Sequence, residues 1–454
     1  MKVVKVRSPF IIEVNETGQI GSKIELSIWN KGNSIPTILS GVSITGTAGQ
    51  FSCTAATFAI GDTLTISGTL GGTGTIVGYT SPKTYYVIAT NGTTTFTLSE
   101  TLGGTAIVTT AGTPTGLTYI TQISGFYSLS KSIPSTSKIN TSYNVSNYVK
   151  EFIDNIKPTK IASSPSYEDN NEWVNFRVKR YKFDGTTYTQ VGSTTDYVGV
   201  NGFTKYTDGV NAITDYFTTG FLSNKLISKN IIKSSLSLKN YVNWIGDFAS
   251  GYRLDLIYVT LDNSYNFTQS ITGLTAGIYN FKIPLTKYPT DPLFILGNRL
   301  DVNLYDASNV QIGSDSVYVY VNEECKYTPV ECTFINRYGG WEVLTFFKQQ
   351  TNTIAVKGTD YKLMPSAINY NTSKGQVKSF NINGTQTIKL NTGFVDENYS
   401  ELITDLLLSE TVLLDGKPVT VKTQGSDLKT SLKDRLINYE MEFEYAYNLI
   451  NDVV

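Results

Sequence analysis

Strict alternation of apolar and acidic side chains runs through Tyr439–Tyr445, which reads YEMEFEY. Successive side chains of an extended strand point to opposite faces, so this spacing predicts a strand with one apolar and one acidic face. Shorter alternating runs recur along the chain, and Asn-Gly and Asp-Gly pairs that favour tight turns stand between many of them. Among these runs are Lys23–Trp29, Trp173–Tyr181, Leu254–Val259 and Val317–Val321. The pattern predicts a mainly β protein with a multidomain β-sandwich architecture.

The composition suits strands and limits the expected partners. The chain has 454 residues, too many for one hydrophobic core, which suggests about two to four domains. It carries 30 tyrosines and 21 phenylalanines, and only 17% of its residues are charged, a balance that favours the pleated surface of strands. The formal net charge of −1 gives no electrostatic reason to expect binding to nucleic acid or to an anionic membrane.

The chain contains no histidine, which excludes Ser-His-Asp and Cys-His catalytic arrangements, histidine zinc ligands and a histidine general base. An enzyme would have to rely on carboxylates, tyrosine or lysine, and no local motif points to such a site. We therefore expect no enzymatic activity, no cofactor and no metal. The acidic residues Glu168, Asp169 and Glu172 lack the ligand order and central glycine of an EF-hand, and we interpret them as part of a solvated loop.

The three cysteines, Cys53, Cys325 and Cys332, form no C-x-x-C motif. Cys325 and Cys332 are close enough in sequence for a loop closed by a disulfide, but two buried thiols are the favoured interpretation in a reducing compartment. The N-terminal residues lack the apolar core of a signal peptide, and no stretch approaches the ~20 apolar residues that span a membrane. We expect folding in a cytoplasm and no membrane span.

Changes in composition divide the chain into four predicted parts. Residues 43–120 carry almost no charge and are rich in Gly and Thr. We expect them to form a small β module inserted into an N-terminal β domain that comprises residues 1–42 and 121–160. A connection tolerates such an insertion because the entropy of loop closure grows only slowly with loop length. Residues 161–324 are predicted to form a β-sandwich domain, which includes a hairpin with its turn at Asp184-Gly185.

Residues 325–454 are predicted to form a mixed β unit with one helix. The helix is expected at residues 396–408, because four apolar side chains there share one face at helical spacing. These four residues are Tyr399, Leu402, Ile403 and Leu406.

Three hairpins are expected in the same unit, with turns at Tyr338–Gly340, Asn383-Gly384 and Asp415-Gly416. Their strands are Phe334–Asn336 with Val343–Phe347, Gln376–Ile382 with Thr385–Leu390, and Val412–Leu414 with Val419–Val421. The alternating strand at Tyr439–Tyr445 closes the unit. Its acidic side chains either are solvated, the favoured interpretation, or pair with basic side chains of a neighbouring subunit; they are Glu440, Glu442 and Glu444.

Several stretches resemble known virion proteins. The segment Gly68–Gly116 resembles a small β module that recurs in virion proteins of tailed bacteriophages. The stretches FINRYGGWEVLTFFK, LNTGFVDENYSELITDLLLSETVLL and LINYEMEFEYAYN are similar to structural proteins of phages and prophages of Bacteroidota, as is Tyr197–Asn211. The resemblance implies a virion protein assembled in the host cytoplasm, with copies of itself and other virion proteins as partners. It identifies no functional residues.

The leading hypothesis is a structural component of the virion in the tail or baseplate region. Such a protein would assemble as a homo-oligomer by packing aromatic strand faces between subunits, in an interface of more than ~2,000 Å². The candidate interface residues are Trp341, Phe346, Tyr439, Phe443 and Tyr445.

Three other functions compete with this hypothesis. A host-surface glycan-binding adhesion protein would stack sugars on exposed aromatic residues such as Trp173, Trp244 and Trp341. A head decoration or head-to-tail connector protein would use the same packing elsewhere in the virion. A glycan-cleaving enzyme would need two carboxylates facing each other about 5–10 Å apart, and is the least favoured function.

Overall fold

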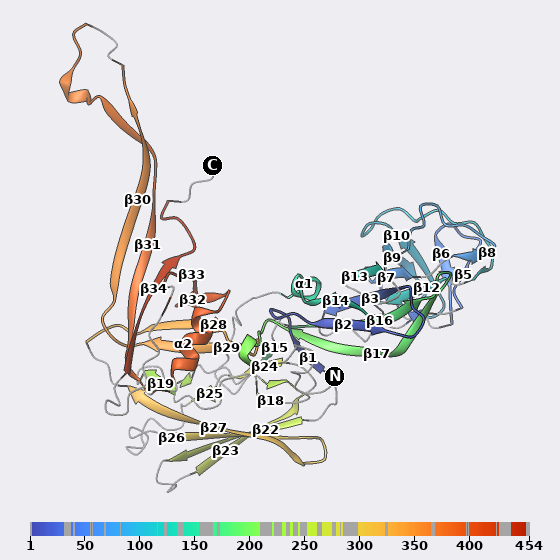
Figure 1. The fold of residues 1–454 in the computed structure, drawn as a ribbon, viewed down its shortest axis with the longest axis horizontal. Coiled ribbons are helices and arrows are strands. Elements are labelled where there is room, and N and C mark those ends of the chain that lie inside the picture. Colours follow the sequence, from blue (N-terminus) through green and yellow to red (C-terminus); the bar gives the residue numbers. More distant parts are fainter. Residues whose placement is uncertain are drawn as a thin grey trace. The chain divides into compact units, whose positions relative to one another are not determined.

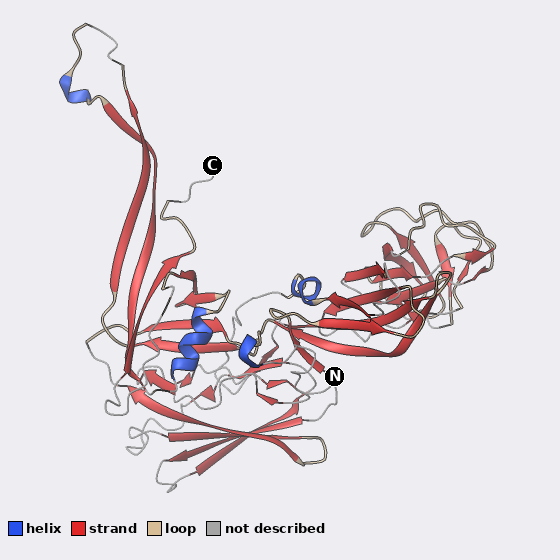
Figure 2. Ribbon diagram, viewed as in Figure 1, coloured by secondary structure: helices blue, strands red, loops and turns tan. Residues whose placement is uncertain are grey.

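The computed structural model confirms a mainly β protein with several sheets (Figures 1 and 2). The chain divides into two compact units, Met1–Asp154 with Asn171–Tyr216, and Asn155–Asn170 with Phe217–Val454. The predicted boundary at residue 325 falls inside the second unit, and those at residues 42 and 120 fall inside the first.

The structure describes residues 2–30, 38–39, 41–54, 56, 58–67, 70–81, 83–115, 117–121, 125–133, 140–153, 167–169, 173–208, 220–221, 229–232, 237–238, 244–245, 252–260, 266–274, 278–281, 283–284, 298–322, 326–364, 368–395, 397, 399–423, 425 and 437–450.

A five-stranded sheet forms the base of the first unit. Its order is β1 (Lys2–Lys5), β17 (Tyr188–Val200), β16 (Trp173–Phe183), β3 (Gly21–Asn30) and β13 (Gly125–Ser132). A two-stranded ribbon of β2 (Ile11–Asn15) and β14 (Asn140–Asn144) and the short helix α1 (Ser146–Lys150) contribute to the same core. Alternate residues of β3 and β16 supply its centre, among them Ile24, Leu26, Ile28, Phe176 and Val178.

The β16–β17 hairpin corrects the predicted domain boundaries. We expected it in the domain of residues 161–324, but β16 pairs along most of its length with β3, and β17 pairs with β1. The hairpin turn at Asp184-Gly185 forms as predicted, because its geometry depends only on neighbouring residues. The partner on the other side of β16 lies far upstream, and alternation does not identify a partner at that separation.

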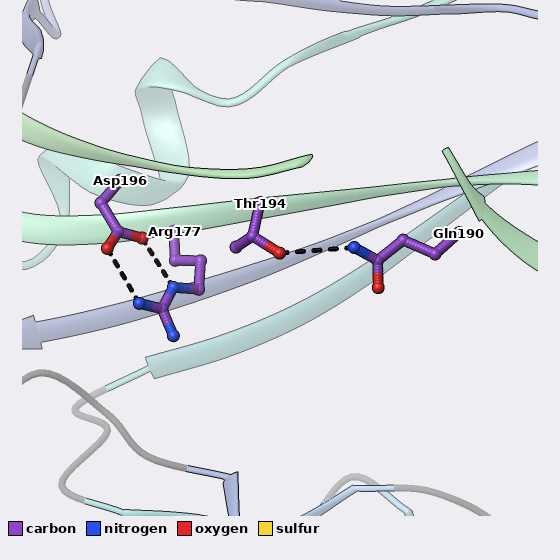
Figure 3. Close-up of polar contacts among 4 residues, drawn as sticks. All are labelled: Arg177, Gln190, Thr194 and Asp196. Atoms are coloured by element: carbon purple, nitrogen blue, oxygen red, sulfur yellow. Dashed lines mark hydrogen bonds and ion pairs between the residues drawn. The ribbon is translucent and has the colours of Figure 1, made fainter. Parts of the chain in front are cut away.

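An aligned ion pair joins the two strands of this hairpin. Arg177 on β16 lies directly opposite Asp196 on β17, and its Nε and Nη2 atoms donate to the two carboxylate oxygens at 2.6 and 2.8 Å (Figure 3). This hydrogen bonding raises the pKa of the Arg177 guanidinium. Gln190 and Thr194 hydrogen-bond to each other along β17. The two-point contact of Arg177 favours a single register of the hairpin.

The Gly- and Thr-rich segment forms its own seven-stranded sheet, with an aromatic core that includes Phe51, Phe96 and Tyr119. β3 and β13 are antiparallel neighbours, so the segment occupies the connection between them, the place predicted for the inserted module. The sheet order is β4 (Ile38–Leu39), β12 (Thr118–Thr121), β7 (Thr63–Ser67), β9 (Lys83–Thr90), β10 (Thr95–Ser99), β6 (Gln50–Ser52) and β5 (Ser43–Ile44), and β8 (Gly71–Gly72) pairs with β11 (Pro114–Thr115).

The described residues in the first part of the second unit form three further sheets. A four-stranded sheet has the order β15 (Tyr167–Asp169), β24 (Ile278–Phe281), β21 (Trp244–Ile245) and β18 (Gly220–Phe221). A five-stranded sheet has the order β19 (Lys229–Ile232), β27 (Gln311–Asn322), β26 (Asn298–Tyr305), β22 (Tyr252–Thr260) and β23 (Asn266–Leu274). The third pairs β20 (Ser237–Leu238) with β25 (Ile283–Pro284).

A seven-stranded sheet dominates the C-terminal part. The helix α2 (Tyr399–Leu407) packs its predicted apolar side into the core on one face of this sheet. The alternation at the chain's end is confirmed, since buried and exposed residues alternate along most of β34. The sheet order is β29 (Trp341–Phe346), β28 (Val330–Ile335), β32 (Val412–Leu414), β33 (Lys417–Val421), β34 (Ile437–Tyr445), β31 (Val377–Val395) and β30 (Thr351–Lys362).

Two of the three predicted hairpins of this unit are confirmed, and one is wrong. β28 pairs with β29, and β32 pairs with β33 around Asp415 and Gly416, whose φ angles of 45° and 83° match a two-residue hairpin turn. The predicted turn at Asn383-Gly384 does not form, because β31 runs without interruption through both residues and pairs with β30 instead.

Candidate assembly interface

A long hairpin of β30 and β31 extends from the edge of the C-terminal sheet (Figures 1 and 2). Residues 351–364 and 368–386 are called the arm below. β34 pairs with β31 only at residues 387–395, so among the described strands the arm part of β31 has β30 as its only partner. All twelve residues of β30 are exposed. Outside its base at residues 383–386, the arm is therefore a two-stranded ribbon with solvent on both faces.

One face of the arm continues the apolar face of the sheet. Asn352 lies opposite the core residue Ile388, and side chains two and four positions further along β30 share its face. These are Ile354 and Val356, which are 59% and 66% exposed. Ile382 lies on the same face, near Gly358, and is 47% exposed. The face that is buried in the sheet is thus uncovered in the arm.

A β-bulge interrupts the arm at its middle. Between the pairs Lys357–Asn383 and Thr359–Phe380, β31 contains one residue more than β30. Asn381 takes up the difference with a φ of 50°, in the left-handed region that asparagine tolerates better than most residues. Beyond the bulge, Asp360 accepts a hydrogen bond from Ser379 across the two strands. Pairing resumes beyond the bulge and continues to Lys362 and Val377.

The end of the chain braces the base of the arm. The backbone N–H of Leu449 donates to the carbonyl of Gly384 at 2.8 Å, and the Asn383 side chain both donates to and accepts from the backbone of Ile450 at 3.0 Å. These contacts explain why Asn383 and Gly384 occupy a strand rather than a turn. Leu449 and Ile450 are themselves 44% and 55% exposed, and Leu449 lies against Gly384 on the apolar face.

The tip of the arm also carries exposed apolar side chains. Met364, Ile368 and Tyr370 are 90%, 100% and 66% exposed. The side chain of Asn371 caps a 3-10 turn at Thr372–Lys374 by accepting from the backbone N–H of Ser373. Single exposed apolar residues are ordinary, but a row of them along one projecting element marks an interaction surface.

The outer face of β34 is acidic, in contrast to the apolar face of the arm. Glu440, Glu442 and Glu444 form the acidic face, and Phe394, which is 64% exposed, lies beside it on β31. A hollow of about 410 Å³ opens between Phe394 and Glu440. Its lining includes Tyr327, Lys348, Lys389 and Asn438.

Lysines of the same sheet pair with part of the acidic face. Lys389 Nζ lies 2.8 Å from Glu440, and Lys422 Nζ lies 3.1 Å from Glu444. Hydrogen bonding and charge attraction from Glu440, together with the charge of Glu442, raise the pKa of Lys389. The sequence predicted that these glutamates are either solvated or paired with a neighbouring subunit. The structure corrects this prediction, because Glu440 and Glu444 pair with lysines of the same chain.

Four of the five predicted interface residues belong to the interior instead. Trp341, Phe346, Tyr439 and Phe443 are at most 2% exposed, and Phe346 packs edge to face on Phe443 with ring centroids 5.7 Å apart. A residue so deeply buried has no surface to offer a partner, so these four positions are corrected to core residues. Tyr445 is partly buried, and its ring lies 5.4 Å from that of Tyr447.

The sequence predicted strands in the β31 half of the arm, at Gln376–Ile382 and Thr385–Leu390, but none in the β30 half. The stretch TNTIAVKGTDYK alternates only partly and was assigned no strand, and the Asn383-Gly384 pair suggested a turn in the middle of its partner. The available signal was the run of Thr, Ile, Val, Tyr and Phe on both sides of residues 363–376, which is typical of paired strands.

The remaining predicted positions give no binding site among the side chains that the structure describes. Trp173 and Trp341 are 5% and 0% exposed and cannot stack on a sugar, and Trp244 lies on β21. Glu168 and Asp169 lie on β15 rather than in a loop, and Glu172 is outside the described residues. Within the described ranges, no three His, Cys, Asp or Glu side chains are grouped to hold a metal ion.

The cysteine pairing stays a prediction. Cys53 and Cys332 are buried, but Cys325 is outside the described residues. Of the helices that the structure describes, none has the length and apolar character to cross a membrane.

The comparisons with known proteins add no family to this picture. No protein-family model matches the sequence, and no curated protein is significantly similar to it.

Proposed function

We propose that this protein is a structural component of a tailed-bacteriophage virion that assembles by subunit packing in the tail or baseplate region. The observation that carries the proposal is the arm, whose apolar side chains are exposed along one face and at the tip. The likeness of several segments to phage virion proteins supports the same function. Its partners are copies of itself and other virion proteins.

The energetics of the arm favour a partner. A two-stranded ribbon is marginally stable in water on its own, because neither face is covered. Burial of a Val or Ile side chain contributes about 1.5–3 kcal/mol, so covering Ile354, Val356 and Ile382 would stabilise both the ribbon and a subunit contact. An exposed apolar surface of this kind is typical of proteins that pack against a partner.

The glycan-binding alternative receives less support. Its argument depended on exposed tryptophan platforms, and Trp173 and Trp341 are both buried. The exposed aromatic residues of the arm, such as Tyr361 and Tyr370, share the ribbon with the exposed Ile354 and Val356, and such a mixture suits a protein partner better than a sugar.

The test combines the mass of the purified full chain by light scattering with its detection in purified particles of the phage that encodes it. We expect a defined oligomer, and labelled antibody at a fixed position on the tail or baseplate in electron micrographs. A monomer that is absent from particles would overturn the proposal. A label on the head would move the protein to the decoration or connector class.

A further inference from the structure

We infer that the arm of one copy docks head to tail on the acidic face of a second copy, beside Phe394. This inference rests on the proposed function and names the partner of the arm. It is carried by three observations: the uncovered apolar face of the arm, the distribution of charge between arm and sheet, and the continuity of β31.

The charges of the arm and of the rest of the C-terminal unit are opposite. Residues 351–386 contain four lysines and one aspartate, a net charge of +3. Residues 326–350 and 387–450 contain nine basic and thirteen acidic residues, a net charge of −4. Two arms would repel each other, whereas an arm and a sheet attract. The charge distribution therefore favours an arm-to-sheet contact over an arm-to-arm contact.

Both surfaces also carry exposed apolar side chains. The arm offers Ile354, Val356 and Ile382 on one face and four lysines along its length, and the receiving surface offers the exposed Phe394 with Glu440 close by. The hollow of about 410 Å³ beside Phe394 has Phe394 and Tyr327 as its aromatic lining and Glu440 among its polar lining. An apolar centre with a charged rim is the usual anatomy of a protein interface.

The contact must join two molecules, because one strand carries both surfaces. β31 runs continuously from Val377 in the arm to Val395, next to Phe394. An arm cannot bend back onto the strand from which it extends. The contact thus joins unlike surfaces of two identical chains, and repetition of such a contact produces a ring or a filament.

Two variants of the full chain test the arm and the acidic face separately. The arm variant, Ile354→Glu with Val356→Glu, places acidic groups on the apolar face. The sheet variant, Phe394→Lys with Glu442→Gln, removes the apolar centre and adds a positive charge. The matched control is Val77→Glu with Val108→Glu, at positions that are 63% and 56% exposed, close to the 66% and 59% of Val356 and Ile354. Circular dichroism and thermal unfolding check that each variant folds.

Light scattering over a dilution series at low salt then measures assembly. We expect the arm variant and the sheet variant to be monomers, with the association weakened about tenfold or more, and the control to assemble like the unchanged chain. An equal mixture of the two variants retains one intact arm and one intact acidic face, so it should form dimers and nothing larger. Salt should weaken the contact, because exposed charges are screened.

Other outcomes overturn the inference, and they separate it from the proposed function. If the sheet variant assembles normally, or if the mixture gives no dimer, the arm docks elsewhere while assembly itself stands. If the control disassembles as fully as the arm variant, the effect does not belong to the arm and the inference fails. A monomeric unchanged chain that still occurs in particles assigns the arm to another virion protein. A monomeric chain that is absent from particles overturns both.

Discussion

Tyr361 and Phe380 pack edge to face across the arm, with ring centroids 5.5 Å apart and planes inclined by 72°. Tyr361 lies opposite Lys378, and Phe380 lies opposite Thr359, so the two rings meet on a diagonal beyond the bulge. Both stay more than 40% exposed, at 44% and 43%. This contact joins the two strands of the arm beyond the bulge.

A double-mutant cycle on this pair should reveal its contribution to the arm. We expect Tyr361→Ala and Phe380→Ala to couple by about 0.5–1.5 kcal/mol, because an edge-to-face pair adds to simple area burial. Amide hydrogen exchange at residues 359–362 and 377–380 measures the effect. Thr353→Ala with Thr387→Ala, a directly opposed pair, is the control and should show little coupling. Additive effects at Tyr361 and Phe380 would contradict the role of the rings.

The helix α2 should depend strongly on one of its leucines and weakly on the next. Leu406 is fully buried against the sheet, whereas Leu408, just past the helix, is 48% exposed. Leu406→Ala should lower the free energy of unfolding by about 2–5 kcal/mol through lost burial and the cavity left behind. Leu408→Ala should change it by about 0.5 kcal/mol or less. Urea unfolding, monitored by proteolysis of the C-terminal unit, measures the free energy of unfolding of both variants. An equal decrease in the two variants would contradict the packing of Leu406 against the sheet.

The turn between β32 and β33 should be sensitive to a β-branched residue. Gly416 has a φ of 83°, where a Cβ meets the following carbonyl oxygen, so Gly416→Val should cost about 1–2 kcal/mol. Gly425 has no neighbouring atom within 4 Å of an added Cβ and no positive φ, so Gly425→Val is the control. Thermal unfolding of both variants measures the difference. A Gly416→Val variant as stable as the control would mean that the turn has another geometry.

Asp184 should make the stability of the first unit depend on pH in acid. Its carboxylate accepts hydrogen bonds from the backbone N–H groups and the side chains of Thr187 and Thr186, which lower its pKa in the folded state. A lowered pKa gives stability that is complete above the unfolded value, about 3.9, and is lost as the pH falls through the folded value. The unfolding free energy of the unchanged chain should therefore exceed that of Asp184→Asn near neutral pH.

The same comparison at lower pH provides the check. The difference between the unchanged chain and Asp184→Asn should stay constant above about pH 5 and shrink as the pH falls below about 4. Chemical unfolding at a series of pH values gives the two curves. A difference that does not vary down to pH 2 would show that the charged form of Asp184 is not the favoured acceptor in this turn.

Local patterns predicted many of the elements. The alternation in Tyr439–Tyr445 predicted β34, the apolar spacing at residues 396–408 predicted α2, and Asp415-Gly416 predicted its turn. Each of these features depends on residues that are neighbours in the chain. Side-chain direction in a strand, the apolar side of a helix and the φ angles of a two-residue turn are all local properties.

The long-range pairings depended on the folded chain. Alternation shows which side chains share a face of a strand, but it does not show which strand lies alongside or what covers the face. For this reason Trp341 and Phe443, which were predicted to lie in an interface, are core residues. For the same reason the hairpin of β16 and β17 pairs with β3 and not with the downstream strands. The chain end at Leu449 and Ile450 holds Asn383-Gly384 in a strand, and β34 stops short of the arm. The same apolar face of β31 is therefore buried in the sheet and open in the arm, because contacts between distant residues decide which part is covered.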